Sequence, residues 1–479
     1  MSFSHERRWL ALVLLAAAQF VVVLDASIVN VALPSIGTSL DFSQDDLSWV
    51  VNAYTLTFGG FLLLGGRMAD LLGRRRMFIA GLILFAGASL AGGLAQNDVW
   101  LIAARAVQGL GAALLSPAAL SLVTEIFEEG AERNKALGVW GAVAGSGGAA
   151  GVLLGGMLTE WAGWEWVLYV NVPIGIAAAL MATRLLPESR NDGARHFDIA
   201  GAVTVTAGLS LLVYSLVNAN DAGWGSTTTF VLLGGAVVLL VSFVLIELRT
   251  KAPLVPFPGI FRIRTIRGIN VTGLLIAMAL FSMFFFISLY MQQVLGFDAL
   301  EAGLAYLPLA VGIIISAGIA STLTTKLGVK PVLILGLMLT AIGLGWFAQI
   351  SPEGTYVGDI LFPALISAFG LGFAFVPMTI AAVAGVEPHE AGLASGMINT
   401  SQQVGGALGL AILAAVANSR TDSVAEAGSP LPVALTEGFQ TALMVGAGFA
   451  LVGALLAYLF VDGREVEENV DGELVPVTS

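Results

Sequence analysis

The stretch WLALVLLAAAQFVVVLDASIVNVAL, residues 9–33, decides the class of fold. A helix needs about 20 apolar residues to cross a hydrocarbon core of roughly 30 Å, and this run is long enough. Its one acidic residue is Asp25. Arg7 and Arg8 precede it, as in a secretory signal, but the run exceeds the usual hydrophobic region of about 7–15 residues. We therefore interpret it as a retained first membrane helix.

The composition of the whole chain agrees with this interpretation. Of its 479 residues, 57% are hydrophobic and only 11% are charged. A soluble domain is about 25% charged, because its surface must face water. The chain cannot cover a core with a surface of that kind, so its solvent is expected to be a lipid bilayer.

Runs long enough to span a bilayer recur along the chain, separated by charges, prolines or glycine clusters. We predict fourteen of them, at residues 9–33, 47–71, 77–94, 99–123, 136–158, 166–186, 199–217, 230–248, 268–294, 302–323, 331–350, 357–383, 392–417 and 439–460. The predicted fold class is an all-α integral membrane protein.

The basic residues predict the orientation of these helices. With the amino terminus inside, all of the 21 Lys and Arg except Arg105 and Arg420 fall in segments on the cytoplasmic side. Lys and Arg stay preferentially in the cytoplasm, so this distribution supports the helix count. We expect a multi-pass protein of the cytoplasmic (inner) membrane with both termini in the cytoplasm.

Several classes of chemistry are excluded. The chain has no Cys, three His in separate segments and a net charge of -12, which argue against thiolate chemistry, metal sites and nucleic-acid binding. No Gly-Lys pair is present, so the chain lacks a phosphate-binding loop for a nucleotide. We expect a protein that is not an enzyme and has no cofactor or metal. Its expected partners are a small-molecule substrate, protons and membrane lipid, and the chain is expected to act as a monomer.

A weak repeat divides the chain. An offset of 255 residues aligns Gly73 with Gly328, Glu132 with Glu387, Ala136 with Ala391 and Gly151 with Gly406. Transporters are often built from repeated halves. The expected organisation is a six-helix bundle in residues 1–190, an inserted two-helix segment in residues 191–262 and a second six-helix bundle in residues 263–479.

The segment GGRMADLLGRRR, residues 65–76, lies at the end of the second predicted helix. Its simplest interpretation is a positively charged cytoplasmic loop. Its order also resembles the loop signature of the major facilitator superfamily, G-x-x-x-D-x-x-G-R-[RK]-[RK], starting at Gly66. The resemblance implies that Asp70 makes interhelical charge contacts that latch one conformation. We expect Arg133 to be its partner, and the predicted latch comprises Gly66, Asp70, Gly73, Arg74 and Arg133.

Further motifs extend the resemblance over nearly the whole chain. Residues 24–34, 101–113, 164–175, 292–308 and 390–409 together resemble the fourteen-helix drug:proton antiporters of that superfamily, with Ser27 where Thr is usual. The resemblance implies a major facilitator fold that rocks about a central cavity. It also implies export of amphipathic, often cationic, drugs in exchange for protons.

The fifth predicted helix departs from the family pattern. It reads GVLLGG at residues 151–156, with Val152 where the antiporter motif has proline. Gly147, Gly151 and Gly155 still recur every four residues, a pattern that allows two membrane helices to pack closely. The missing proline removes an expected kink site.

Asp25 and Arg105 lie well inside predicted helices, where a charge costs at least about 2.5 to 3.5 kcal/mol. At about 1.5 Å per residue, Asp25 lies roughly 24 Å from the cytoplasmic boundary and Arg105 about 9 Å below the outer one, so their depths overlap. Burial favours the neutral acid and the guanidinium favours the carboxylate. We therefore predict that Asp25, with Arg105, carries the coupled proton. A structural ion pair is the alternative.

Polar and aromatic stripes predict the walls of the substrate cavity. On the fourth helix Gln108 and Ser116 share a face with Arg105, and on the thirteenth the amides recur at helical spacing. The ninth helix carries aromatic residues suited to adaptable binding, although such a stripe often faces lipid. The predicted cavity residues are Tyr54, Gln108, Ser116, Phe281, Phe285, Tyr290, Gln293, Asn399, Gln402 and Gln403.

Other functions remain open at the level of sequence. A dedicated exporter of a self-made metabolite or lipid would share every motif. An importer is disfavoured by the antiporter-type fifth helix. A nontransporting membrane sensor or scaffold is a further alternative.

Overall fold

The structure is a computed structural model that describes residues 5–42, 47, 49–128, 130–189, 198–250, 253, 255, 263–384, 386 and 391–462. The described residues form helices and no strands. Among the described residues, thirteen helices are long and apolar enough to cross a membrane, or 14 when the bent α6 counts as one span. The predicted all-helical membrane fold is confirmed.

The described residues of the amino-terminal half form six long helices and one short one. They are α1 (His5–Ser39), α3 (Trp49–Leu72), α4 (Arg74–Gly93), α5 (Asp98–Ile126), α6 (Ala131–Trp161), α7 (Trp166–Tyr169) and α8 (Asn171–Leu185). Two more helices follow, α9 (Ile199–Ala222) and α10 (Thr227–Glu247).

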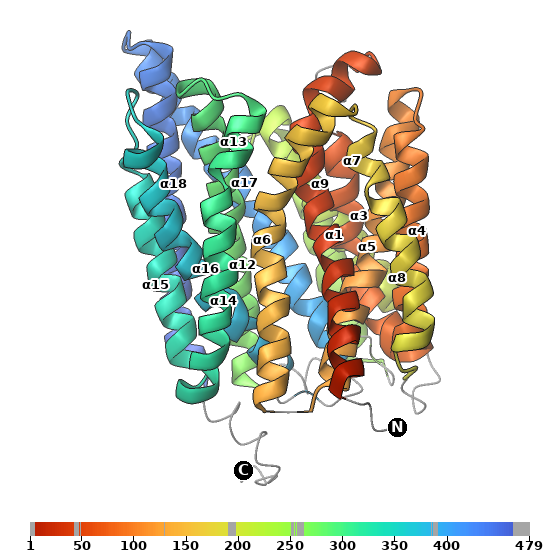
Figure 1. The fold of residues 1–479 in the computed structure, drawn as a ribbon. Coiled ribbons are helices and arrows are strands. Elements are labelled where there is room, and N and C mark those ends of the chain that lie inside the picture. Colours follow the sequence, from red (N-terminus) through yellow and green to blue (C-terminus); the bar gives the residue numbers. More distant parts are fainter. Residues whose placement is uncertain are drawn as a thin grey trace.

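In the carboxy-terminal half, the described residues form two π-helical turns, η1 and η2, among the α-helices. Its elements are α12 (Arg264–Leu289), η1 (Tyr290–Val294), α13 (Ala299–Ala305), α14 (Leu307–Leu327), α15 (Val329–Phe347), η2 (Tyr356–Leu361), α16 (Phe362–Val383), α17 (Ala391–Glu426) and α18 (Leu431–Phe460). The first residues of α1 and the last residues of α18 lie at the same end of the bundle (Figure 1).

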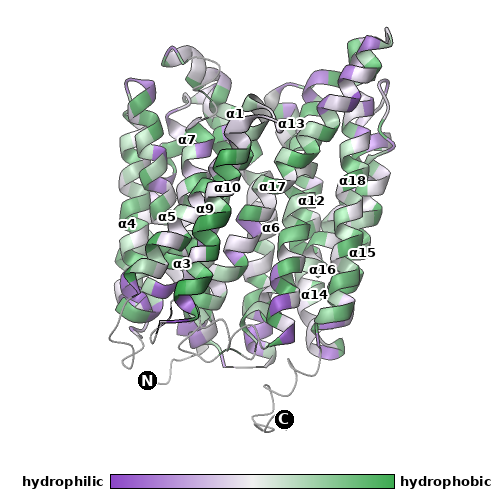
Figure 2. Ribbon diagram, turned by 180° about the vertical axis from the view of Figure 1, so that it is seen from behind, coloured by the Kyte–Doolittle hydropathy of each residue, from purple (hydrophilic) through white to green (hydrophobic). Residues whose placement is uncertain are grey.

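Apolar residues cover the surface that a bilayer would contact. The long helices are apolar over most of their length and the hydrophilic residues gather at the two ends of the bundle (Figure 2). On α10, Val237, Val238 and Val241 are all more than half exposed. A helix satisfies its own backbone hydrogen bonds, so these faces can meet hydrocarbon without an unpaired polar group.

The two halves meet through close helix contacts. Gly66 of α3 lies against the backbone of Gly392 of α17, and Gly138 of α6 lies against Ser321 of α14. A side chain at either glycine would collide with the other half. We call the end of the bundle at which α3 meets the beginning of α17 the Asp70 end.

The inserted helices are placed by α9, which packs against both α3 and α17. Ser210 of α9 lies beside Gly60 of α3, and Tyr214 stacks on Trp49 with ring centroids 5.6 Å apart. Helix α9 therefore contacts helices of both halves. The three domain boundaries given by the repeat stay a prediction.

Helix α6 packs along α1 through its regularly spaced glycines. Gly147 lies against Val23, Gly151 against Ser27, and Gly155 against the carbonyl of Ile28. The helix bends by 43° between its segments Ala131–Gly148 and Ala150–Trp161. The helix therefore bends even though Val152 removes the kink site that a proline would supply. The glycine- and serine-rich turn at residues 145–148 accounts for the bend, because such residues pack weakly within their own helix.

Candidate functional site

Asp25 lies at the centre of a fully buried polar cluster in the amino-terminal half. Its side chain has no exposed surface. The Nη1 atom of Arg105 lies 2.5 Å from Oδ2, and the amide nitrogens of Gln108 and Asn171 each lie 2.7 Å from Oδ1. Three donors on two other helices, α5 and α8, thus meet one carboxyl group of α1. This arrangement of donors fits the ionised carboxylate.

Arg105 is held from several directions. Its Nε donates to the carbonyl of Val50 at 2.9 Å, and Nη1 also donates to Oε1 of Gln108 at 2.6 Å. The guanidinium carbon lies 4.4 Å from the ring centroid of Tyr54, a cation–π contact. Arg105 is itself 1% exposed. The predicted neighbours Asp25 and Arg105 are therefore brought together, with Tyr54 and Gln108 beside them.

Two members of the cluster were not identified from the sequence. Ser89 of α4 accepts a hydrogen bond from Gln108 at 2.8 Å and one from Asn171 at 3.4 Å. Its own hydroxyl donates to the carbonyl of Phe85 at 2.8 Å. An asparagine at the beginning of a predicted membrane helix was a usable signal for Asn171. A lone serine in an apolar helix carries little signal.

Burying the ion pair of Asp25 and Arg105 has a desolvation cost that its contacts must offset. Taking two charges out of water costs several kcal/mol each, and good geometry with added hydrogen bonds is needed to offset that cost. Asp25 has those bonds. Removing its charge would leave the Arg105 guanidinium without a counter-ion among its described contacts. The cluster is therefore sensitive to the protonation of one carboxyl group.

Asp70 forms a second buried site, between the two halves. Its Oδ1 lies 3.2 Å from Nη2 of Arg74 and 3.2 Å from the backbone nitrogen of Gly392. Its Oδ2 lies 3.0 Å from the backbone nitrogen of Leu393. These two nitrogens belong to the first turn of α17, where helical N–H groups lack partners and the helix dipole favours a negative charge.

The predicted pairing of Asp70 with Arg133 is wrong. Arg133 instead donates to the carbonyls of Phe127 at 2.9 Å and Thr124 at 2.7 Å, within its own half. Arg74 does contact Asp70, and its other nitrogen Nη1 lies 3.2 Å from Glu125. Gly73 adopts a positive φ of 112° between α3 and α4, which glycine allows at little cost.

The remaining predicted cavity residues differ in their burial and in their contacts. Ser116 is fully buried, and Asn399, Gln402 and Gln403 are half-buried on α17. Gln403 lies against Gly59 of α3, in the opposite half, whereas Asn399 donates to the carbonyl of Ser395 of its own helix at 2.8 Å. These α17 residues stay a prediction as substrate contacts.

The aromatic stripe of α12 is only partly as expected. Phe281 and Phe285 are 43% and 41% exposed, and Phe281 lies beside Gly406 of α17. Tyr290 does not line an opening, because it is fully buried and its hydroxyl donates to the carbonyl of Ser351 at 2.7 Å. Gln293 is exposed.

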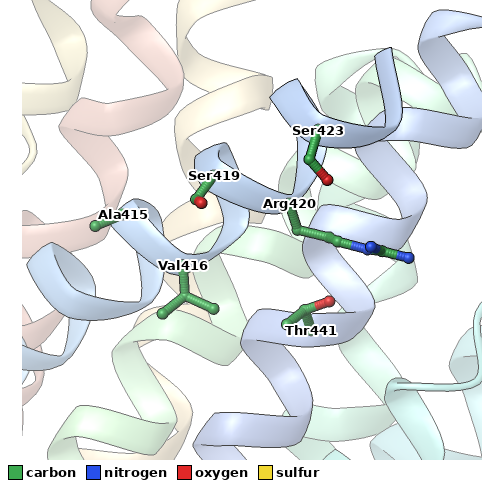
Figure 3. A pocket seen from close by; sticks show the side chains of 6 residues that line it. All are labelled: Ala415, Val416, Ser419, Arg420, Ser423 and Thr441. Atoms are coloured by element: carbon green, nitrogen blue, oxygen red, sulfur yellow. The ribbon is translucent and has the colours of Figure 1, made fainter. Parts of the chain in front are cut away.

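A groove of about 500 Å³ lies between α17 and α18 (Figure 3). Its lining residues are Ala415, Val416, Ser419, Arg420, Ser423 and Thr441. Arg420 reaches Glu437 at 2.5 Å, so its charge is paired. None of the predicted cavity residues lines this groove.

Comparison with known proteins identifies the family. Residues 15–410 match the Major Facilitator Superfamily. The chain belongs to this superfamily. It is therefore a membrane transporter with a small-molecule substrate, and not an enzyme, as the sequence predicted.

Two of the similar proteins are named for resistance to an antibiotic or for its export. The puromycin resistance protein pur8 of Streptomyces alboniger is 40% identical over 466 residues, 96% of this chain and 92% of that protein. The cephamycin export protein CmcT of Amycolatopsis lactamdurans is 42% identical over 428 residues, 88% of this chain and 87% of that protein. The crystal structure of the human organic anion transporter MFSD10 (TETRAN) has a TM-score of 0.69 at 16% identity, covering 95% of this chain and all of that one, which supports the fold alone.

Proposed function

We propose that this chain exports amphipathic, drug-like compounds, cationic or apolar, across the cytoplasmic membrane in exchange for protons. Asp25 carries the proton. The single observation behind this proposal is that Asp25 is fully buried and lies 2.5 Å from Arg105, with two amide donors on its other oxygen. Ionisable groups buried within membrane helices are functional candidates by default, because they are costly to keep there.

The coupling would operate through the charge of the pair. With Asp25 ionised, its charge balances that of Arg105. Its hydrogen bonds to Arg105 of α5 and Asn171 of α8 then hold α1 against these two helices. When Asp25 takes up a proton, its attraction to Arg105 weakens and this packing loosens. Alternation between two conformations would thereby depend on the proton, as antiport requires.

The latch supports alternating access. Asp70 bonds to the first turn of α17 across the two halves, so it stabilises a conformation in which the Asp70 end is closed. We place this end at the cytoplasm, because the basic residues gather there. Export would then require this contact to break and re-form in each cycle.

Asp25→Asn tests the proposal. Inverted membrane vesicles containing the protein would take up ethidium when an imposed proton gradient is present. The variant keeps the size of the side chain but cannot take up or release a proton, so we expect gradient-driven uptake to be lost. Asp422→Asn, an exposed acid on α17, is the matched control and should retain uptake. Undiminished proton-driven uptake by Asp25→Asn would leave the pair with a structural role only.

A dedicated exporter of one self-made compound is a second candidate function. The two relatives described above are each named for a single antibiotic, puromycin or cephamycin, which favours a narrow substrate range. A panel of structurally unrelated compounds separates the two functions. Protection of cells from several unrelated compounds supports broad export, whereas protection from one chemical class alone supports the dedicated exporter.

A further inference from the structure

The hydrogen bonds around Asp25 leave one acceptor unused. Oδ1 of Asn171 is buried, and no described residue donates to it. The other end of the same amide, Nδ2, donates to Asp25 at 2.7 Å. A buried acceptor without a donor is destabilising, so its retention beside an ionisable group has to be explained.

The other groups that bond to Asp25 have no comparable freedom. Both ends of the Gln108 amide are used, because Oε1 accepts from Arg105 at 2.6 Å and Nε2 donates to Asp25 and to Ser89. A guanidinium has donors only, so Arg105 cannot accept a proton from a carboxylic acid. Among the three side chains that bond to Asp25, Asn171 alone has a spare acceptor.

The position of Asn171 suits a side chain that rotates on a fixed backbone. It is the first residue of α8, directly after the break that separates α8 from α7. The preceding turn is anchored by Tyr169, whose hydroxyl donates to the carbonyl of Gly93 at 2.6 Å. Rotation about the last torsion of an asparagine exchanges its donor and its acceptor without moving the backbone.

We infer that Asn171 is a positioning residue that follows the protonation of Asp25. Its amide donates through Nδ2 to the ionised carboxylate and, after rotation, accepts through Oδ1 the hydrogen of the protonated acid. Both states of Asp25 are then satisfied without rebuilding the cluster. This inference rests on the proposed proton coupling. It names Asn171 as the group that sets the pH range of the exchange.

Few charged or titratable groups near Asp25 would disturb this pH range. Arg105 of α5 is the ion-pair partner, and Tyr54 of α3 lies beneath the guanidinium. Helix α6 presents Gly147 and Gly151 to the turn that carries Asp25. The contact from α8 is the amide of Asn171 itself. On α7, the hydroxyl of Tyr169 is engaged with Gly93.

Asn171→Leu tests the inference, because leucine has a similar shape but neither a donor nor an acceptor. A hydrogen bond to the carboxylate is stronger than one from the neutral acid, so its loss favours the protonated form. We expect the pH midpoint of ethidium–proton exchange in proteoliposomes to rise by about one unit, a tenfold change in proton affinity. Asn171→Gln, which keeps the amide, should restore most of the wild-type midpoint.

Asn30→Leu is the matched control. Asn30 lies on α1 and donates to the carbonyl of Ala26 in its own helix, so its replacement should leave the midpoint unchanged. A lower exchange rate at every pH with an unchanged midpoint in Asn171→Leu would show a packing role only and overturn the inference.

A second measurement tests the inference even if Asn171→Leu folds poorly. Infrared difference spectra of the wild-type protein in lipid nanodiscs, recorded across a pH titration, should show a side-chain amide band that changes together with a buried carboxyl band. Both bands should be absent in Asp25→Asn. A carboxyl band without an accompanying amide change would overturn the inference while leaving the proposed function intact. Proton-driven exchange by Asp25→Asn would instead overturn the proposed function.

Discussion

At the scale of single residues, Arg105 tests whether the cluster needs a positive charge or a guanidinium. Its nitrogens reach Asp25, Gln108 and the carbonyl of Val50, which a lysine ammonium cannot contact together in the same plane. We expect Arg105→Lys to slow gradient-driven ethidium transport by about tenfold in vesicles, as the loss of one good hydrogen bond would. Arg267→Lys, at an exposed position, is the control. A wild-type rate in Arg105→Lys would mean that charge alone suffices.

Also at this scale, the sequence predicts the ion pair but not every residue that contacts it. The helical rise is constant, so counting residues placed Asp25 and Arg105 at one depth. The contact of Asn171 with Asp25 depends on the rotation of α8 about its axis, which no count of residues determines. The sequence predicts Arg133 as the partner of Asp70 because a charged side chain can be identified from the sequence. The backbone N–H groups at the beginning of α17, which are the real partners across the two halves, have no side-chain signature.

At the scale of helices, the spans were predictable because a bilayer imposes one length on every crossing. Irregular turns were not. The π-helical turn at Tyr290–Val294 has a wider turn than an α-helix, so residues beyond Leu289 present different faces from those that regular spacing predicts. Tyr290, the first residue of this turn, packs in the core instead of lining an opening. The bend of α6 likewise depends on a local glycine-rich turn and not on the proline that is missing at Val152.

At the scale of the whole molecule, the latch at Asp70 should set the balance between conformations. Asp70→Asn keeps the volume but removes the charge that faces the amino end of α17, an interaction worth up to about 2 kcal/mol when partly buried. We expect the conformation that is closed at the Asp70 end to lose roughly tenfold in population relative to the open one. The chain has no native Cys, so Glu128→Cys and Thr322→Cys provide a unique pair of spin-label sites, one on each half at that end. In Asp70→Asn the longer inter-label distances should gain population, whereas Asp98→Asn, at the opposite end of α5, should leave the distribution unchanged. Identical distributions in Asp70→Asn and the wild type would show that glycine packing between α3 and α17 holds this end closed without the charge.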